Sequence, residues 1–262
     1  MTGDWKRVAL AGIEFDCVVE ADVVAHVLAE LAEGRGGRII TPNVDILRRA
    51  MSDTEARNDV GSATVVVADG APLVWASRLA RKPLPARVPG SDLIWSLSAA
   101  LGRTQHSVYL LGGEPGTAKV AASVLTDRFP TLAVSGFDSP PFGFDADPVA
   151  LDMVCRRAAE AKPDVVFVGL GFPKQERLIV RLREALPSAW FMGCGAAIGI
   201  VAGVRRRAPD WMQRAGLEWA HRLINEPGRL VRRYLLHDMP FAVRLLTMSA
   251  LGRTGPLEVN QK

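Results

Sequence analysis

The chain has 262 residues, of which 48% are hydrophobic and 23% charged, a balance that excludes a disordered or fibrous protein. Its three cysteines form no CxxC pair, which argues against a disulfide framework and favours a reducing compartment. The net charge is +4, but residues 203–253 alone hold ten arginines and four acidic residues. Such a basic segment suits an anionic partner: a membrane surface, a nucleic acid or a phosphorylated substrate.

The first elements in chain order are a hairpin-like strand pair over Val8–Val19, expected at one edge of the fold, and a helix over Ala21–Glu33. Short apolar runs then alternate with stretches of helical periodicity, which predicts an α/β fold with a mostly parallel, Rossmann-like sheet and helices on both faces. The expected buried strands are Arg38–Thr41, Thr64–Ala68, Ser107–Leu111, Thr131–Ser135, Val165–Gly169 and Trp190–Gly193. Further expected helices are Thr117–Phe129, Pro148–Ala161 and Lys174–Leu186.

The alternation stops near Arg205. Beyond it we expect helices over Trp211–Asn225 and Gly228–His237, followed by the apolar stretch Met239–Leu251. We therefore divide the chain into an α/β catalytic body, residues 1–203, and a basic, membrane-associating helical appendage, residues 204–262. The uncharged residues 185–204 are better explained by a buried strand and a glycine-rich turn than by a membrane span. The N-terminus shows no secretory signal, so we expect a cytoplasmic protein.

Polar or glycine-rich motifs follow five of the predicted strands. Because ligands of open parallel sheets bind beyond the carboxyl ends of the strands, this clustering predicts a site there. The glycines let the backbone approach a ligand closely, and they lead into helices whose N-termini suit a diphosphate. Each glycine motif taken alone is explained equally well as a tight turn. The motifs are Thr41-Pro42-Asn43, Ala68-Asp69-Gly70, Leu111-Gly112-Gly113, the segment from Gly169 to Glu176, and Gly193-Cys194-Gly195.

Asp69 is the candidate general base, because a carboxylate at this edge can accept a proton from a substrate hydroxyl. The alternative is a helix N-cap. Thr41 and Asn43 either bind a sugar or position Asp69, or they cap the next helix. Arg87 either clamps a phosphate or carboxylate, or is a solvated loop charge.

The basic segment places Arg222, Arg229, Arg232 and Arg233 at intervals that can converge on one helical face. A basic amphipathic helix is typical of a membrane surface, and the alternative is a helix packed on the body with a solvated arginine face. The four histidines are not at metal-ligand spacing and no tight DxD occurs, so we expect no metal site.

The motifs, in this order, resemble the WecG/TagA/CpsF glycosyltransferases from about Ile39 to Tyr234. The most specific part is the stretch from Arg207 to Tyr234. Besides the strand-end motifs, the resemblance is carried by Arg87-x-x-Gly90-x-Asp92, Gly171-x-Pro173-x-Gln175-Glu176, Arg207-Ala208-Pro209-x-Trp211, Leu217-Glu218-Trp219 and Glu226-Pro227-x-Arg229-x-x-Arg232-Arg233-Tyr234.

The resemblance implies an inverting, metal-independent glycosyltransferase without a cofactor. Such enzymes move N-acetylmannosamine, its uronic acid or a related hexose from a UDP-sugar to a polyprenyl-diphosphate-linked sugar in cell-surface polysaccharide synthesis. It further implies peripheral association with the inner face of the cytoplasmic membrane and no nucleic-acid partner. Whether the chain forms a homo-oligomer is left open.

Carried over by position, the resemblance makes Asp69 the base, with Thr41 and Asn43 beside the substrate and Arg87 and Gln175 lining the pocket. Arg222, Arg229 and Arg232 would reach the diphosphates from the appendage. One departure is Gly199, where family members often carry Asp, and this leaves uracil recognition open. The residues expected to bind the substrate or nucleotide are Gly112, Gly113, Gly171, Gln175, Glu176, Gly193 and Gly195.

Two other function classes fit parts of the sequence. The glycine-rich turns also suit an NAD- or nucleotide-dependent oxidoreductase or epimerase. The basic segment also suits a non-catalytic peripheral membrane adaptor, which would tolerate the loss of Asp69.

Overall fold

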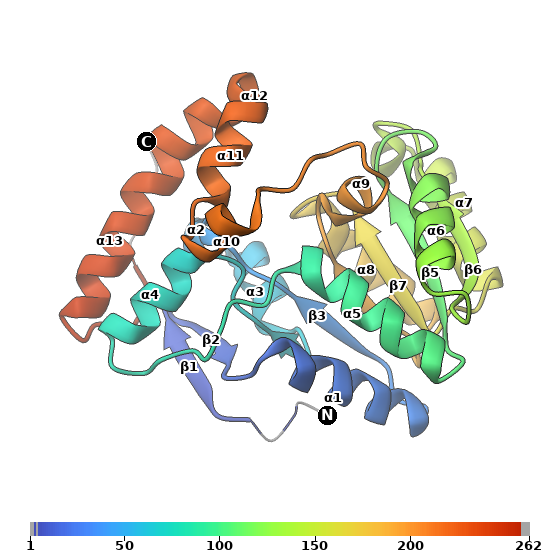
Figure 1. The fold of residues 1–262 in the computed structure, drawn as a ribbon, viewed down its shortest axis with the longest axis horizontal. Coiled ribbons are helices and arrows are strands. Elements are labelled where there is room, and N and C mark those ends of the chain that lie inside the picture. The colour runs from blue at the N-terminus through green and yellow to red at the C-terminus, as the bar shows by residue number, and fades with distance from the viewer. Residues whose placement is uncertain (1–2, 4, 258–262) are drawn as a thin grey trace.

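The computed structural model describes Gly3 and residues 5–257. Its centre is a six-stranded sheet in the order β4-β3-β8-β7-β5-β6, in which every pairing is parallel. This confirms the predicted α/β fold with helices on both faces of a parallel sheet (Figure 1). The strands are β3 (Gly37–Ile40), β4 (Val65–Val66), β5 (Ser107–Gly112), β6 (Ala133–Asp138), β7 (Val165–Gly169) and β8 (Trp190–Gly193).

The central strands are apolar because both of their faces are covered. In β7, Val165 and Phe167 enter one hydrophobic cluster, whereas Val166 and Val168 enter the cluster on the opposite face. The first face is covered by α1 (Glu20–Ala32), α5 (Gly90–Arg103), α6 (Thr117–Arg128) and α9 (Ala197–Val201). The second face is covered by α2 (Val44–Ser52), α3 (Thr54–Gly61), α4 (Ala71–Leu79), α7 (Pro148–Glu160) and α8 (Lys174–Ala185).

The predicted N-terminal hairpin forms, as β1 (Arg7–Leu10) and β2 (Ile13–Asp16), but it is a separate antiparallel sheet. Its link to the main sheet is Asp16, whose carboxylate accepts a 2.8 Å hydrogen bond from the backbone N–H of Val66 in the edge strand β4. The Asp16 side chain thus occupies a backbone N–H of the edge strand β4 that a strand of another chain could otherwise pair with, and this protects the edge from such pairing.

Strand β6 is the predicted strand that differs most in its bounds. It begins at Ala133 and continues to Asp138, whereas the apolar pattern predicts Thr131–Ser135. Leu132 closes a turn by donating to the carbonyl of Phe129, which delays the start of the strand. The strand lies at an edge and its residues alternate between exposed and half-buried, so its second half carries no continuous apolar signal.

The C-terminal segment is helical, as predicted, but its breaks differ. Gly216, at φ +72°, divides the helix expected over Trp211–Asn225 into α10 (Asp210–Arg214) and α11 (Glu218–Asn225). The expected helix over Gly228–His237 is instead α12 (Pro227–Arg233) followed by a π-helical turn, η2 (Tyr234–Asp238), that leads directly into α13 (Met239–Ala250).

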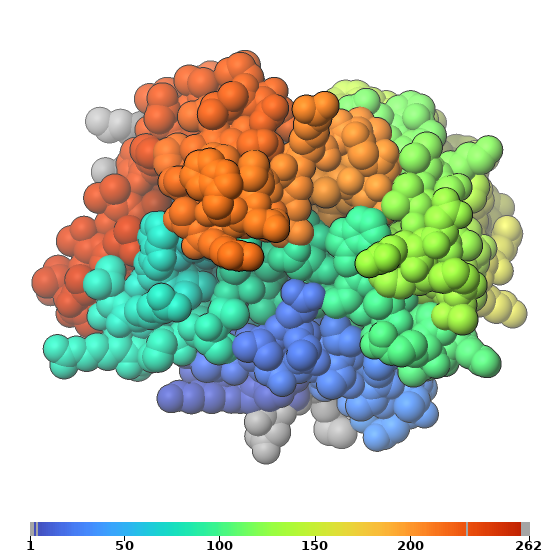
Figure 2. Space-filling model, in the orientation of Figure 1, coloured from blue at the N-terminus to red at the C-terminus, as the bar shows by residue number. Residues whose placement is uncertain are grey.

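Residues 204–257 share a hydrophobic core with the body. Phe241 and Leu245 of α13 belong to the same buried cluster as Leu73 and Ala76 of α4, the helix beside it in Figure 1. Figure 2 shows the segment, in orange and red, packed against α4 in cyan. Within the described part of the chain, no helix is long and apolar enough to cross a membrane.

Candidate active site

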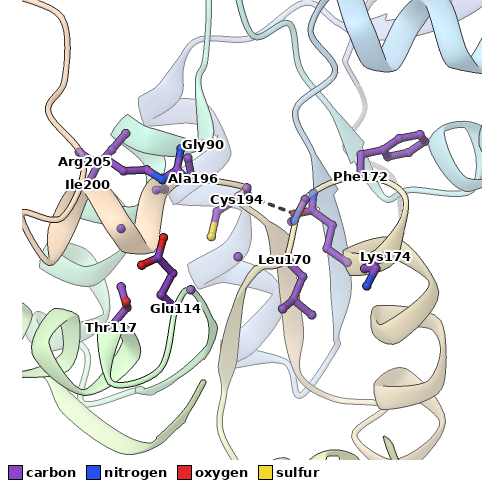
Figure 3. A pocket seen from close by; sticks show the side chains of 18 of the residues that line it. Gly90, Glu114, Thr117, Leu170, Phe172, Lys174, Cys194, Ala196, Ile200 and Arg205 are labelled. Carbon is purple, nitrogen blue, oxygen red and sulfur yellow. Dashed lines mark hydrogen bonds between the residues drawn. The ribbon is translucent and has the colours of Figure 1, made fainter. Parts of the chain in front are cut away.

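A cavity of about 640 Å³ lies at the carboxyl ends of the strands. Loops that follow all six parallel strands contribute to its wall, from Asp69 after β4 to Phe142 after β6. Figure 3 shows Glu114 and Thr117 on one side, Leu170, Phe172 and Lys174 on the other, and Cys194 between them. This is the position at which an open parallel sheet binds its ligand.

Three helices of at least twelve residues begin at the cavity. Gly90, Thr117 and Lys174 are the first residues of α5, α6 and α8, and all three line the wall. Unpaired N–H groups and the positive end of the helix dipole favour an anion at each of these ends. The wall therefore suits a ligand with phosphate groups.

Asp69 lines the cavity and does not cap a helix. The N-cap residue of α4 is Gly70, at φ +122°, and the Asp69 backbone N–H donates to the carbonyl of Pro42. The pKa of the Asp69 carboxyl is raised to about 6, chiefly by burial and to a smaller extent by the nearby Glu218, while Arg222 and Arg87 oppose the shift. A carboxylate with a pKa near the working pH is suited to general-base catalysis.

Thr41 and Asn43 also line the cavity, directly after β3. Asn43 is the N-cap of α2, because its Oδ1 accepts a 3.1 Å hydrogen bond from the backbone N–H of Ile46. The capping alternative for Asn43 is therefore correct, and it fixes the side chain at the cavity wall beside the end of β4.

The predicted glycine turns meet at the centre of the cavity wall. Gly113, Gly171, Gly193 and Gly195 all line it, and Gln175 lies among them. The side-chain oxygen of Gln175 accepts hydrogen bonds of 3.1 Å from the backbone N–H groups of both Gly171 and Gly195. One amide thus joins the turn after β7 to the turn after β8.

The structure places neither Gly112 nor Glu176 in the cavity wall. Gly112 lies against β7, where an added Cβ would be 2.5 Å from the carbonyl oxygen of Gly169. The Glu176 side chain is fully buried opposite Arg38, with Nη1 3.6 Å from Oε2. Burial raises the pKa of Glu176 to about 7, although Arg38 opposes the shift.

The structure does not place Arg87 in the cavity wall. Its guanidinium pairs with Glu218 of α11 and lies 3.5 Å from the Gln213 side-chain oxygen, so its charge faces the C-terminal segment and not the cavity wall. Arg207 extends this network, since it pairs with Asp92 and lies 3.8 Å from Glu218. The sequence shows the charges but not that they join loop 83–92 to α11.

The arginines of the C-terminal segment divide into two groups. Arg222 lines the cavity, together with Arg205 and Arg233. Arg232, in contrast, is exposed and does not contribute to the wall, and its contact with a lipid diphosphate stays a prediction. The side chain of Arg229 lies outside the described residues.

Several wall residues have no assigned role from sequence reasoning. Glu114 and Lys174 stand beside the predicted glycine turns, and this proximity is the signal that could identify them. Phe142 belongs to the Pro-rich loop after β6 and is fully exposed, with Lys174 Nζ 5.1 Å from the centre of its ring. Arg49 projects from α2, and no strand-end motif indicates it.

The titratable residues of the cavity do not form a metal-ligand cluster. Among the residues that the structure describes, no group of three or more His, Cys, Asp or Glu side chains is placed to hold a metal ion. The positive charge at the wall comes instead from arginines, Lys174 and helix N-termini.

Comparison with known proteins decides the family. The profile of the "Glycosyl transferase WecG/TagA/CpsF family" matches residues 8–254. The chain belongs to this family. It is 32% identical over 197 residues to a protein of Bacillus subtilis strain 168, and the match covers 75% of each chain. It is 28% identical over 230 residues to a protein of Staphylococcus aureus strain MW2, covering 86% of this chain and 87% of the relative.

Both relatives carry the same name, "N-acetylglucosaminyldiphosphoundecaprenol N-acetyl-beta-D-mannosaminyltransferase", as does a protein of Bacillus spizizenii that is 31% identical over 199 residues. The chain is therefore a glycosyltransferase of the WecG/TagA/CpsF family. Of the three function classes that the sequence suggests, the comparison therefore supports the glycosyltransferase and not the oxidoreductase or the non-catalytic adaptor.

Proposed function

We propose that this glycosyltransferase moves N-acetylmannosamine from a UDP-sugar to an N-acetylglucosamine carried on a polyprenyl diphosphate. The relatives' names supply the transferred sugar and the acceptor. The observation that carries the proposal is that Asp69, which does not cap a helix and whose pKa is raised, lines the same cavity as Arg222 and Arg233. That cavity combines a base for an acceptor hydroxyl with cations for two diphosphates.

The reaction is a single displacement. Asp69 takes the proton of the acceptor hydroxyl as its oxygen bonds to the anomeric carbon of the donor sugar. The bond from that carbon to the diphosphate oxygen breaks at the same time, so the configuration is inverted and UDP leaves. Negative charge grows on the leaving diphosphate, and arginine side chains and helix N-termini at the wall stabilise it.

The C-terminal segment is proposed to bring the enzyme to the inner face of the membrane. Its helices α11 to α13 expose Ile224, Leu235, Leu236 and Val243, of which Ile224 is 75% accessible. Exposed arginines such as Arg232 lie on the same helices. Apolar side chains beside cations are suited to an anionic lipid surface, where a lipid-linked acceptor would be found.

The test is UDP release from a panel of UDP-sugars, with a short-chain polyprenyl diphosphate carrying N-acetylglucosamine as acceptor. We expect release that requires both substrates and is greatest with UDP-N-acetylmannosamine, and a disaccharide product by mass spectrometry. Asp69→Asn and a reaction without acceptor are the controls. UDP release with another UDP-sugar but not with UDP-N-acetylmannosamine would refute the proposed donor. The absence of product with every UDP-sugar would refute the proposed function.

A further inference from the structure

The Gln175 amide has a fixed orientation at the centre of the cavity wall. Its oxygen accepts from the N–H groups of Gly171 and Gly195, both at 3.1 Å. Its nitrogen donates to Glu176 Oε1, also at 3.1 Å. A rotation of the amide by 180° would place N–H groups opposite the two glycine N–H groups and an oxygen opposite a carboxylate, and all three hydrogen bonds would be lost.

Glu176 is the neighbour that makes this orientation the favourable one. One of its oxygens accepts from Gln175, and the other lies 3.6 Å from Arg38 Nη1. Arg38 is held in turn by Ser62, whose hydroxyl accepts a 2.9 Å hydrogen bond from Nη2. Gly193 leaves the space for this arrangement, because a Cβ there would be 2.4 Å from Gln175 Nε2 and 2.5 Å from Glu176 Oε1.

We propose that Glu176 is a positioning residue for sugar transfer. One of its oxygens accepts a hydrogen bond from Gln175 and the other pairs with Arg38, and this fixes the Gln175 amide that holds the two glycine turns of the cavity wall. The inference rests on the proposed function for its catalytic consequence. The geometric part, the link between the turns after β7 and β8, is independent of the substrate. Glu176 itself acts through Gln175, since its side chain is fully buried and does not reach the cavity.

The chemistry of the pair makes Glu176→Gln a specific test. A carboxylate has two acceptor oxygens, whereas a carboxamide has one oxygen and one NH₂. The charged Arg38 is the stronger donor and takes that oxygen. The NH₂ then faces Gln175, which must turn its own oxygen toward it and release Gly171 and Gly195.

Replacing Arg38 as well should reverse the effect. In Arg38→Met/Glu176→Gln the new amide oxygen has no competing cation, so it can accept from Gln175 as Glu176 Oε1 does. A role in stability alone predicts no such recovery at the glycine turns. Val154→Ala, which removes buried methyl groups from the cluster under α7, is the control for lost stability.

The experiment combines hydrogen exchange with kinetics, both well below the unfolding temperature of each variant. For Glu176→Gln we expect the amides of Gly171 and Gly195 to exchange about 10-fold faster and kcat/KM to fall about 10- to 100-fold. Both should recover in the double variant and stay unchanged in Val154→Ala. Gly193→Ala, whose Cβ would crowd both ends of the hydrogen bond from Gln175 to Glu176 without removing the charge of Glu176, should also speed exchange. It is the second variant if Glu176→Gln does not fold.

Wild-type exchange and wild-type kinetics in Glu176→Gln would overturn the inference, as would wild-type exchange in Gly193→Ala. Failure of the inference is distinct from failure of the proposed function. If the wild-type enzyme makes no product, the proposed function is refuted, and the exchange rates still report whether Glu176 holds the two turns.

Discussion

Arg233 Nη1 lies 3.7 Å from Asp45 Oδ2, so an arginine of the C-terminal segment is held against the first turn of α2. Asp238 holds the same guanidinium from the other side, with Nε 3.1 Å from Oδ2, and Arg48 bridges the two carboxylates. Helix α2 begins directly after Asn43, which lines the cavity. The network therefore joins the π-helical turn of the C-terminal segment to the loop beside Asp69.

Asp69→Asn should reduce kcat by about 10²- to 10⁴-fold, the usual cost of removing a general base. The amide keeps the shape of the side chain but cannot take a proton. The measurement is UDP release at saturating substrate, with circular dichroism to show that the variant is folded. A rate near that of the wild type would exclude Asp69 as the base.

The same substitution should stabilise the protein above pH 6. Because the pKa of Asp69 is raised to about 6, the folded protein binds this proton more tightly than the unfolded chain, and ionised Asp69 opposes folding. That penalty grows as the pH rises from about 4 to 6 and is fully present above pH 6. We expect Asp69→Asn to have the higher Tm at pH 8 and no advantage at pH 4.

The pH profile of transfer should show a rising limb near pH 6. Below this value Asp69 is protonated and cannot act as a base, whereas above it the carboxylate is available. Arg222→Ala removes the cation that most lowers this pKa, so its limb should move to higher pH. A limb that stays in place in Arg222→Ala would assign it to another group.

Transfer activity should survive EDTA. Arginines and helix N-termini line the cavity, so the chain itself can supply positive charge to stabilise a leaving diphosphate. The measurement is UDP release before and after chelation and dialysis. Loss of activity that Mg²⁺ or Mn²⁺ restores would contradict the metal-independent mechanism.

The main sheet and the strand-end motifs are predictable because their signals are local. Each buried strand is a short apolar run, and the carboxyl ends of parallel strands meet at one edge, which brings Thr41, Asp69, Gly113 and Gly171 to one cavity. The start of α7 follows equally from Asp147 and Pro148, since the Asp147 side chain caps the helix.

Local spacing does not reveal which distant residue a charged side chain contacts. Arg87 faces Glu218, 131 residues away, and Glu176 of α8 faces Arg38 of β3, so neither position could be inferred from local spacing. A motif shows that a charged residue is present but not whether it faces ligand or another side chain. The π-helical turn at Tyr234–Asp238 has no sequence signal of its own.

Arg222→Ala and Arg232→Ala form a matched pair of charge removals. Each removes one arginine from adjoining helices, but only Arg222 of the two lines the cavity. We expect Arg222→Ala to lower kcat/KM about 10-fold or more, because arginine–phosphate contacts are specific, and Arg232→Ala to stay near the wild type with a soluble acceptor. Equal losses of kcat/KM in both variants would show that the total positive charge of the segment, and not a specific contact between Arg222 and the substrate, determines the rate.

Membrane binding should depend on the exposed apolar side chains of the C-terminal helices. Leu236 and Val243 are 64% and 63% accessible, so Leu236→Glu/Val243→Glu places two acidic groups on the surface without disturbing the core residues Phe241 and Leu245. Wild-type binding to anionic liposomes should weaken with salt but persist, because screening removes the electrostatic part alone.

In Leu236→Glu/Val243→Glu, the binding that persists at high salt should be lost, while transfer to a short, soluble acceptor continues at the wild-type rate. Leu79→Glu, which changes a 46% accessible leucine on α4, is the control for a new charge elsewhere on the surface. Co-sedimentation with phosphatidylglycerol liposomes between low and high salt measures the binding. If the double variant binds as the wild type does, the exposed side chains of η2 and α13 are not the membrane contact.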